Sequence, residues 1–590
     1  MTAAVLERRM GRERRNGAET DFSGRWRFLL LLMVGAMLVL VARAVTLQVM
    51  DRQFLQQQGD MRHLSVIPVP AYRGRILDRN GELLAISTPV KSLWVNPREF
   101  EASPEQFAQL AELTGLSQRE LHKKVNGDSG RQFAYIARRI SPELAQQVTD
   151  LDLPGVYAER EYRRYYPSGE VTAHLLGVTS VDDTGQEGLE LAFNDSLRGV
   201  PGARRIMRDG KRRIIEDIDS VREPVPGHDL KLTIDQRLQY LAYRELKKAV
   251  MQHQARSGSL VLLDSRNGEV LAMVNQPSYN PNSRESLKPG VTRNRALTDV
   301  YEPGSTVKPF AVAAALELNT FSPDTMINTS AGKMSLGSHV VTDVHAYGML
   351  NMAGVLQKSS NVGVTRIALS VPPEKFWAFF NNLGFGQPLE SGFPGEAAGR
   401  MPPHHNLRPF EQATLSFGYG LSSSTLQLAR AYAALANNGV MPFVSLVQTP
   451  ERREQRVMSA RTASQVRSML ELVVSREGTA MKASVPGFRV AGKTGTVKKS
   501  VAGGYAESQY LAVFAGMAPA SDPRLVMVVM LDEPSAGEYY GGAVAAPVFS
   551  SVMEGALRIL AIAPDQLDAP QLRTADAAVA PAHAATTQKH

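Results

Sequence analysis

The pattern of apolar and polar positions near the N-terminus predicts a membrane-spanning helix. Residues 26–48 are almost entirely apolar, with Arg27 at their start and Arg43 near their end. A helix that crosses a bilayer needs roughly 20 such residues. Seven arginines stand at or before position 27, against four acidic residues, and positive charge favours the cytoplasmic side. We therefore expect a single-pass anchor in the inner (cytoplasmic) membrane, with residues 1–25 in the cytoplasm and the chain from about Asp51 in the periplasm.

A cleaved signal peptide is the alternative interpretation of this segment. Ala42, Arg43 and Ala44 have the small-x-small form of a cleavage site. The long basic leader, and an apolar pattern that continues past Ala44, favour an uncleaved anchor. Arg43 is then expected either to extend toward the outer headgroups or to face a partner helix.

Residues 51–228 predict a mixed α+β module without catalytic motifs, which we call the pedestal. Asn80-Gly81, flanked by apolar runs, predicts a tight hairpin because both positions tolerate positive φ. Helical periodicity extends over residues 103–149, and short strands with many charges follow over 162–227. No redox, metal or nucleotide motif occurs in this part of the chain.

Residues 229–562 predict a second α+β domain, in which helices cover a mostly antiparallel sheet. Asp235 or Thr233 caps the first helix, and Asn267-Gly268 joins the first two strands. The expected elements are a helix over 236–253, strands at 259–264 and 269–274, mostly helix over 304–440, strands at 510–517 and 525–531, and a helix over 545–560. The Ala/Pro/Thr-rich tail, residues 563–590, lacks periodicity and is expected to be disordered.

Composition and charge narrow the possible chemistry. The 590 residues are 43% hydrophobic and 21% charged, which suits several packed domains. The chain has no cysteine, which excludes disulfides, thiolate metal sites and a thiol nucleophile. Its net charge of +8 is spread over the whole length, and outside the basic N-terminus no patch of Lys and Arg with interleaved aromatic residues suggests nucleic-acid binding.

A phosphate-binding loop is one interpretation of the region around Lys493. Residues 487–494 match the pattern G-x4-G-K-[ST] letter for letter. A helix must follow such a loop, but Gly495 stands where its first turn would be. The strands at 510–517 and 525–531 are also joined by too short a link for a parallel pair. We therefore reject nucleotide binding.

A serine nucleophile with a lysine base is the competing interpretation. Pro303 and Gly304 predict a turn that ends at Ser305, and Lys308 follows one helical turn later on the same face. A serine hydroxyl needs a base to take its proton. A lysine becomes a base only where burial or positive potential destabilises its charge. Helix packing around the Ser305–Lys308 pair would supply that burial.

Two further motifs make the interpretation of Ser305 and Lys308 as a catalytic pair more specific. Ser359 and Asn361 form a Ser-x-Asn motif between helical stretches, and Lys493-Thr494-Gly495 is predicted on an exposed edge strand. Each motif alone has an ordinary structural explanation, such as a helix cap or a solvated lysine. Their order along the chain, Ser-x-x-Lys, Ser-x-Asn and Lys-Thr-Gly, is typical of one class of serine acyltransferases.

The chain at this point resembles the serine penicillin-binding proteins and serine β-lactamases. Further motifs are similar to those of the high-molecular-mass class B members, and in particular to their division-specific FtsI branch. These motifs are RGRILDRNG at 73–81, RYYP at 164–167, GLE at 188–190, NRALT at 294–298, EPGSTVKPF at 302–310, SFGYGLS at 416–422 and LQLA at 426–429.

The resemblance implies peptidoglycan D,D-transpeptidation at the division septum. Ser305 would attack the bond between two terminal D-alanines, with Lys308 as the general base and Ser359 as the proton shuttle. Asn361 would hold the donor amide, and an acceptor amine would then take the acyl group. No metal or other cofactor is implied.

The third motif would bind the substrate's terminal carboxylate and its reacting carbonyl. Lys493 and Thr494 would attract the carboxylate, which β-lactams imitate. Gly495 and Thr496 would line the site, and the N–H groups of Ser305 and Thr496 would form the oxyanion hole.

The resemblance also implies partners and leaves two alternatives open. No segment resembles a glycosyltransferase, so glycan polymerisation would fall to an FtsW-like membrane polymerase within a division complex. One alternative is a β-lactam sensor or hydrolase, which would use the same acylation chemistry. The other is a non-catalytic scaffold, whose role in septation would survive the loss of Ser305.

Overall fold

A computed structural model describes most of the chain in two compact units. The described residues are 23–53, 64–126, 133–208, 214–329, 331–404, 407–451, 453–501 and 503–566. Most of the predicted cytoplasmic segment (residues 1–22 of it) and most of the predicted tail (residues 567–590) lie outside these ranges. The first unit combines residues 1–69 with 201–223, and the second combines residues 70–200 with 224–590.

The first unit contains the predicted anchor helix and a small sheet. Residues Gly24–Met50 form one continuous helical stretch that is long enough to cross a membrane, and an 18-residue part of it has a mean hydropathy of 2.6. The prediction of one apolar N-terminal helix is thereby confirmed. Its elements are α1 Ser23–Val45, the π-helical turn η1 Thr46–Met50, and the strands β1 Leu64–Val69, β6 Gly202–Arg208 and β7 Ile214–Arg222 of an antiparallel three-stranded sheet.

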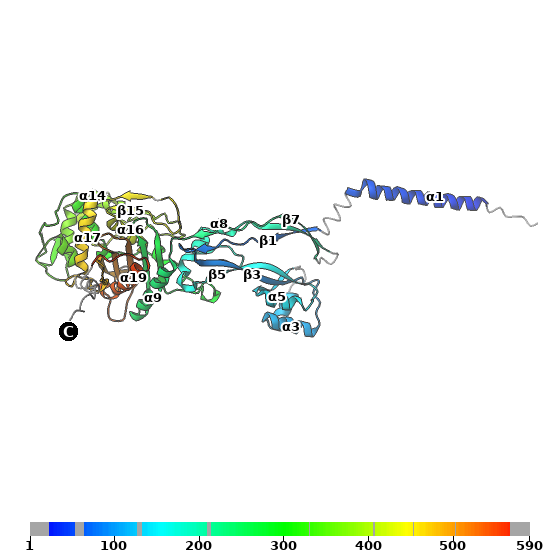
Figure 1. Cartoon of the computed structure of the whole chain (residues 1–590), viewed down its shortest axis with the longest axis horizontal. Coiled ribbons are helices and arrows are strands. Elements are labelled where there is room, and N and C mark those ends of the chain that lie inside the picture. The colour runs from blue at the N-terminus through cyan, green and yellow to red at the C-terminus, as the bar shows by residue number, and fades with distance from the viewer. Residues whose placement is uncertain are drawn as a thin grey trace, which may run out of the picture. The chain divides into compact units, whose positions relative to one another are not determined.

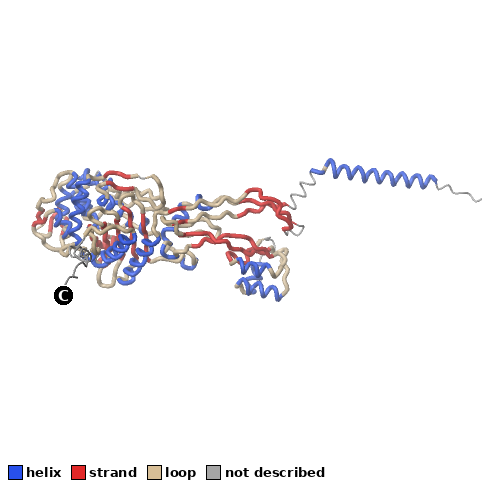
Figure 2. Tube along the Cα trace, viewed as in Figure 1, coloured by secondary structure: helices blue, strands red, loops and turns tan. Residues whose placement is uncertain are grey.

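The second unit begins with a sheet of order β4-β3-β2-β8, with β5 paired to β3. Figure 1 shows β3 and β5 side by side, and Figure 2 draws the strands in red. The Asn80-Gly81 turn joins β2 to β3, as predicted. The elements of this part are β2 Ile76–Leu77, β3 Leu83–Val95, α3 Pro104–Thr114, α4 Gln118–Asn126, β4 Ala134–Ile140, α5 Pro142–Thr149, β5 Val156–Tyr165, η2 Gly169–Val171, α6 Ala173–Leu176, α7 Gly188–Ala192, α8 Asn194–Arg198 and β8 Leu230–Lys231.

The prediction of helix throughout residues 103–149 is wrong for Ala134–Ile140, which form strand β4. This segment pairs with β3, and Trp94 of β3 lies against the rings of Phe133 and Tyr157. Strand pairing and ring packing therefore outweigh the local helical periodicity.

A buried ionic cluster holds the three class B-like motifs together. Arg73 Nε donates to Glu190 Oε2 at 2.8 Å, and Arg164 Nε donates to Glu190 Oε1 at 2.6 Å. All three side chains are almost fully excluded from solvent. Arg164 also donates to the carbonyl oxygen of Gly74 at 2.8 Å. One carboxylate thus ties together segments that are far apart in the sequence.

The rest of the second unit surrounds a five-stranded sheet of order β10-β9-β19-β18-β17, in which every pairing is antiparallel. The predicted fold class, an α+β chain whose antiparallel sheet is flanked by helices, is confirmed. The principal elements are α9 Gln236–Gln252, β9 Ser257–Asp264, β10 Val270–Gln276, α10 Arg295–Thr298, η4 Gly304–Val307, α11 Lys308–Glu317, α12 Met352–Gln357, α13 Asn361–Leu369, α14 Pro373–Asn382, α15 Pro409–Ser416, α16 Thr425–Ala436, α17 Ala460–Val474, β17 Ala491–Val501, β18 Gly504–Ala518, β19 Leu525–Asp532, α18 Gly541–Val544 and α19 Ala546–Ile559.

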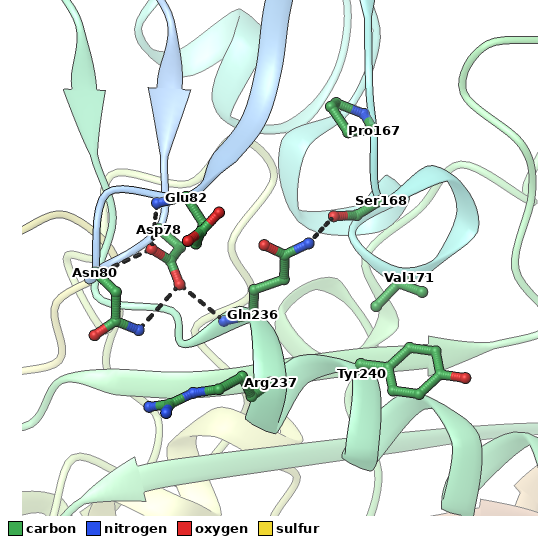
Figure 3. A pocket seen from close by; sticks show the side chains of 9 residues that line it. All are labelled: Asp78, Asn80, Glu82, Pro167, Ser168, Val171, Gln236, Arg237 and Tyr240. Carbon is green, nitrogen blue, oxygen red and sulfur yellow. Dashed lines mark hydrogen bonds between the residues drawn. The ribbon is translucent and has the colours of Figure 1, made fainter.

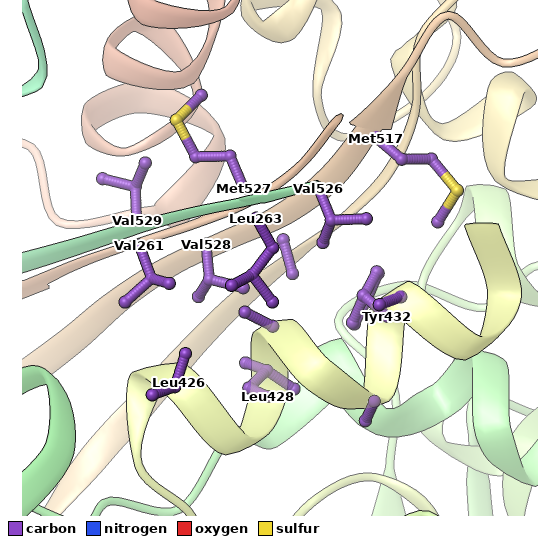
Figure 4. Packing of buried hydrophobic residues seen from close by; sticks show 14 of the residues in the cluster. Val261, Leu263, Leu426, Leu428, Tyr432, Met517, Val526, Met527, Val528 and Val529 are labelled. Carbon is purple, nitrogen blue, oxygen red and sulfur yellow. The ribbon is translucent and has the colours of Figure 1, made fainter. Parts of the chain in front are cut away.

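Alternating side chains cover both faces of this sheet. Val526 and Val528 of β19 point toward α16, whereas Met527 and Val529 point the other way (Figure 4). Helices α9 and α19 contact each other, α9 contacts β9 and β10, and α19 contacts β19. The strands are therefore buried on both faces, which explains why β9 and β10 have no exposed residue.

The cap of α9 is Asp235, whose Oδ1 accepts a hydrogen bond from the backbone N–H of Arg237 at 3.0 Å. The alternative cap, Thr233, instead donates to the carbonyl oxygens of Val270 and Ser445. This helix start borders a cavity of about 620 Å³ beside the β2–β3 hairpin (Figure 3). Asp78 joins the two elements, accepting from Gln236 N at 3.1 Å and from Asn80 N at 2.7 Å.

The prediction of mostly helical structure over residues 304–440 is only partly right. Two small strand pairs interrupt it, β11 Ile327–Asn328 with β14 Met349–Leu350 and β12 Lys333–Leu336 with β13 His339–Thr342. Gly332, Gly337 and Gly348 take positive φ in this region, and such turns stop a helix. The remaining elements are β15 Val440–Pro442, β16 Glu454–Arg456 and the 3₁₀ turns η3 Arg284–Ser286 and η6 Met481–Ala483.

We predict that Glu190→Gln lowers the free energy of unfolding by about 3 kcal/mol or more, because it leaves two buried guanidinium groups without their counter-charge. Denaturant unfolding of the detergent-solubilised chain, followed by tryptophan fluorescence, measures the change. Glu554→Gln, at an exposed position of α19, is the matched control. Equal stability of the two variants would contradict a structural role for the Arg73–Glu190–Arg164 cluster.

Candidate active site

Ser305 lies in the 3₁₀ turn η4, directly before helix α11. Gly304 takes a φ of +55°, and a Cβ there would approach Val497 Cγ2 of β17 to 2.3 Å. A Cβ on Gly495 would likewise lie 3.0 Å from the carbonyl oxygen of Pro303. Glycines on both segments thus allow the turn that carries Ser305 to lie directly against strand β17.

Two buried lysine amines meet at one hydroxyl group. Lys308 Nζ donates to Ser359 Oγ at 3.2 Å and to the carbonyl oxygen of Ser359 at 2.5 Å. Lys493 Nζ donates to the same Ser359 Oγ at 3.0 Å. Both lysine residues are 0% exposed. The structure therefore brings together one residue from each of the three sequence motifs.

Burial strongly lowers the pKa values of both lysine amines. The pKa of Lys308 lies well below its ordinary value because the amine is desolvated and because the Lys493 charge repels a proton there. The negative charge of Asp343 raises the pKa of Lys308, but this effect is smaller than the other two. Burial lowers the pKa of Lys493 to about 7. The lowered pKa favours the neutral form of Lys308, which is the form that can accept a proton.

Ser359 occupies a tight corner between α12 and α13. Its φ of +57° is uncommon for a residue other than glycine. Ser360 follows as the N-cap of α13, and its Oγ accepts a hydrogen bond from the N–H of Gly363 at 2.8 Å. The left-handed residue directs the Ser359 hydroxyl to the two lysines while the next residue starts a helix. Such conformations concentrate at functional sites.

Asp343 supports this corner, and the sequence analysis missed it. Its Oδ1 accepts from the N–H groups of Asn361 at 2.5 Å and Val362 at 3.0 Å, and its Oδ2 accepts from Ser360 Oγ at 2.5 Å. It precedes Ser360 by 17 residues and belongs to no spacing pattern. No signal in the sequence separates it from a surface aspartate.

Asn361 lies at the start of α13, beside Ser360. Its side-chain Nδ2 donates to the carbonyl oxygen of Thr342 at 3.0 Å. The structure therefore places Asn361 next to the Ser359 corner, but its side-chain amide bonds to the last residue of β13 and not to Ser305 or to β17.

The four predicted residues of the third motif lie on β17, at the edge of the five-stranded sheet. Thr494 Oγ1 lies 2.9 Å from Thr479 Oγ1, and Thr496 Oγ1 accepts from the N–H of Gly541 at 3.0 Å. Among the described residues, no strand pairs with the outer side of β17, which suits an extended peptide ligand there. The strand location of Lys493, with the antiparallel β18–β19 pair, also confirms the rejection of a phosphate-binding loop.

The arrangement is suited to acyl transfer. It combines a serine at a helix start, a buried amine with a lowered pKa as a possible base, a hydroxyl shared between two amines and an edge strand beside the serine. A base must remove the serine proton before attack, and fixed donors must stabilise the developing oxyanion. Lys308, and the backbone of the Ser305 turn and of β17, are the candidates for these two tasks.

Two protein-family models match the chain beyond its N-terminal helix, and together they cover most of the described second unit. A model of the penicillin-binding protein transpeptidase domain matches residues 258–554. A model of the penicillin-binding protein dimerisation domain matches residues 68–232.

Curated relatives match over most of their own length. The peptidoglycan D,D-transpeptidase FtsI of Escherichia coli K12 is 42% identical over 550 residues, covering 92% of this chain and 93% of that protein. A probable peptidoglycan D,D-transpeptidase, PbpC of Pseudomonas aeruginosa, is 43% identical over 545 residues, covering 92% and 96%.

Two solved structures of peptidoglycan-related proteins are also similar to this chain. The apo transpeptidase domain of Burkholderia pseudomallei penicillin-binding protein 3 is 45% identical, with a TM-score of 0.53, and covers 57% of this chain and 98% of that one. A peptidoglycan synthetase from Bifidobacterium adolescentis has a TM-score of 0.69 at 23% identity, covering 86% and 98%, and shows the shared fold.

Proposed function

The chain belongs to the penicillin-binding protein transpeptidase family, and from this premise we propose that it is a septal peptidoglycan D,D-transpeptidase and a target of β-lactams. The family resemblance inferred from the motifs is thereby confirmed. The observation that carries the proposal is the meeting of Lys308 and Lys493 at the Ser359 hydroxyl, beside the turn that bears Ser305.

The first half-reaction forms an acyl-enzyme on Ser305. Neutral Lys308 takes the Ser305 proton as the Oγ atom attacks the carbonyl carbon of the penultimate D-alanine. The N–H groups of Ser305 and Thr496 stabilise the oxyanion. The tetrahedral intermediate then collapses, the C–N bond breaks, and the leaving D-alanine amine receives a proton through Ser359.

The second half-reaction transfers the acyl group to an acceptor amine of another stem peptide. The amine loses its proton along the same route, the new amide forms, and Ser305 regains its hydrogen. Asn361 holds the donor amide, and Lys493 and Thr494 hold the terminal carboxylate. Gly495 keeps the strand close to the Ser305 turn, since any side chain would meet Pro303 and Thr306.

We extend the proposal to the placement and partners of the chain. The apolar helix anchors it once in the inner membrane, with the basic leader cytoplasmic and residues 229–562 acting in the periplasm as the transpeptidase domain. Residues 51–228 serve as a non-catalytic pedestal. The chain works with an FtsW-like glycan polymerase and other division proteins.

We predict that penicillin forms a lasting one-to-one adduct with the detergent-solubilised chain and none with Ser305→Ala, as measured by intact mass. Acylation needs the Ser305 oxygen, whereas slow deacylation distinguishes a transpeptidase from a hydrolase. Rapid loss of the adduct would favour the hydrolase alternative. No adduct on the folded parent would favour the scaffold alternative.

The pH dependence of acylation tests Lys308 as the base. The rate should rise with pH as Lys308 loses its proton. Asp343→Asn removes a negative charge that favours the charged amine, so the pKa of Lys308 falls further and the acid limb of the profile moves to lower pH. Asp324→Asn, at an exposed position in the loop between α11 and β11, should keep the parent profile. A shift to higher pH in Asp343→Asn would exclude this assignment.

Single cysteines test the topology, because the parent chain has none. A membrane-impermeant maleimide, added to cells with a permeabilised outer membrane, should label Thr449→Cys, at an exposed position. Thr2→Cys should react only after lysis. Labelling of Thr2→Cys in unlysed cells would show the opposite orientation or a leader outside the cytoplasm.

A further inference from the structure

The loop of residues 475–480, which follows α17, bridges two of the three catalytic motifs. Gln357 Nε2 donates to Ser475 Oγ at 3.3 Å, and Lys358 Nζ donates to the carbonyl oxygen of Glu477 at 3.0 Å. Gln357 and Lys358 are the two residues before Ser359 in the sequence. At the other end of the loop, the Thr479 hydroxyl contacts that of Thr494 on β17 at 2.9 Å.

The backbone holds Thr479 firmly in this position. The N–H of Ala480 donates to the carbonyl oxygen of Val473 at 2.9 Å. A Cβ on Gly542 of α18 would lie 2.2 Å from the carbonyl oxygen of Thr479 and 3.4 Å from Thr494 Cγ2. Only a glycine there lets the loop and β17 approach this closely. The Thr479 residue itself remains exposed, so a ligand on β17 can reach it.

The direction of the hydrogen bond between Thr479 and Thr494 determines whether Thr494 can donate to a ligand. A hydroxyl has one hydrogen to donate and two lone pairs. Lys493 Nζ lies 3.5 Å from Thr494 Oγ1 and can only donate when charged. If Thr494 gave its hydrogen to Thr479, it would offer only lone pairs to an ionised carboxylate. If Thr479 donates instead, the hydrogen of Thr494 is free for the carboxylate.

We propose that Thr479 is a specificity-determining residue, whose hydroxyl donates to Thr494 and so directs the Thr494 hydrogen to the terminal carboxylate of the substrate or β-lactam. Lys493 and Thr479 then both donate to Thr494, and Thr494 donates to the anion. In such a chain of hydrogen bonds each bond polarises and strengthens the next. Thr479 acts through Thr494 and takes no part in bond making. This inference rests on the proposed function.

The test compares a carboxylate ligand with its neutral counterpart. We would measure the second-order rate constant for acylation of the detergent-solubilised chain by benzylpenicillin and by its methyl ester. Thr479→Val keeps the shape but loses the hydroxyl. We expect about a tenfold loss with the acid, typical of one hydrogen bond to a charged group, and little change with the ester. Thr479→Ser should retain the parent rates.

Thr449→Val, at an exposed threonine of another loop, is the matched control and should behave as the parent. An equal loss of both rates in Thr479→Val would show that the loop only supports the site, and an unchanged acid rate would show no role; either result overturns the inference while leaving the proposed function intact. Failure of both compounds to acylate the parent would overturn the proposed function itself.

Discussion

The site depends on one electrostatic constraint: two fully buried lysine amines share a single hydroxyl, and they cannot both carry a charge without a large cost. In water either amine would be protonated at neutral pH. The fold removes that water by placing Lys308 at the start of an apolar helix and Lys493 on a strand covered by α17. Packing around the two lysines therefore shifts their protonation toward the neutral form and also fixes their positions.

Close backbone approach is the second requirement, because the three motifs lie on separate segments. Gly304, Gly495 and Gly542 stand where segments meet, and a side chain at any of them would clash. The sheet supplies the rigid support, since β17 pairs with β18 along almost its whole length. The same reliance on buried contacts between distant segments occurs in the pedestal, where Glu190 joins two arginines.

The sequence contained the local parts of this arrangement but not the contacts between them. The apolar anchor, the Asn-Gly hairpins and the strands at 510–517 and 525–531 follow from period and turn chemistry, and the structure has them. Strand β4 was missed because pairing with β3 outweighs its local pattern. Ser305, Lys308, Ser359 and Lys493 stand in recognisable spacings. Asp343 and Thr479 instead make contacts with other segments of the chain that no spacing indicates.

The unequal environments of the two lysines give each a separate place in the proposed mechanism. Lys493, with a pKa of about 7, carries part of the positive charge at neutral pH, on the strand proposed to bind the substrate carboxylate. The pKa of Lys308 lies well below its ordinary value because of its burial and, after that, because of the Lys493 charge. A carboxylate bound at Thr494 would favour the charged form of Lys493, and this charge would in turn favour neutral Lys308. Substrate binding and base activation would then be coupled through one hydroxyl, so a ligand without the carboxylate would be both bound less tightly and attacked more slowly.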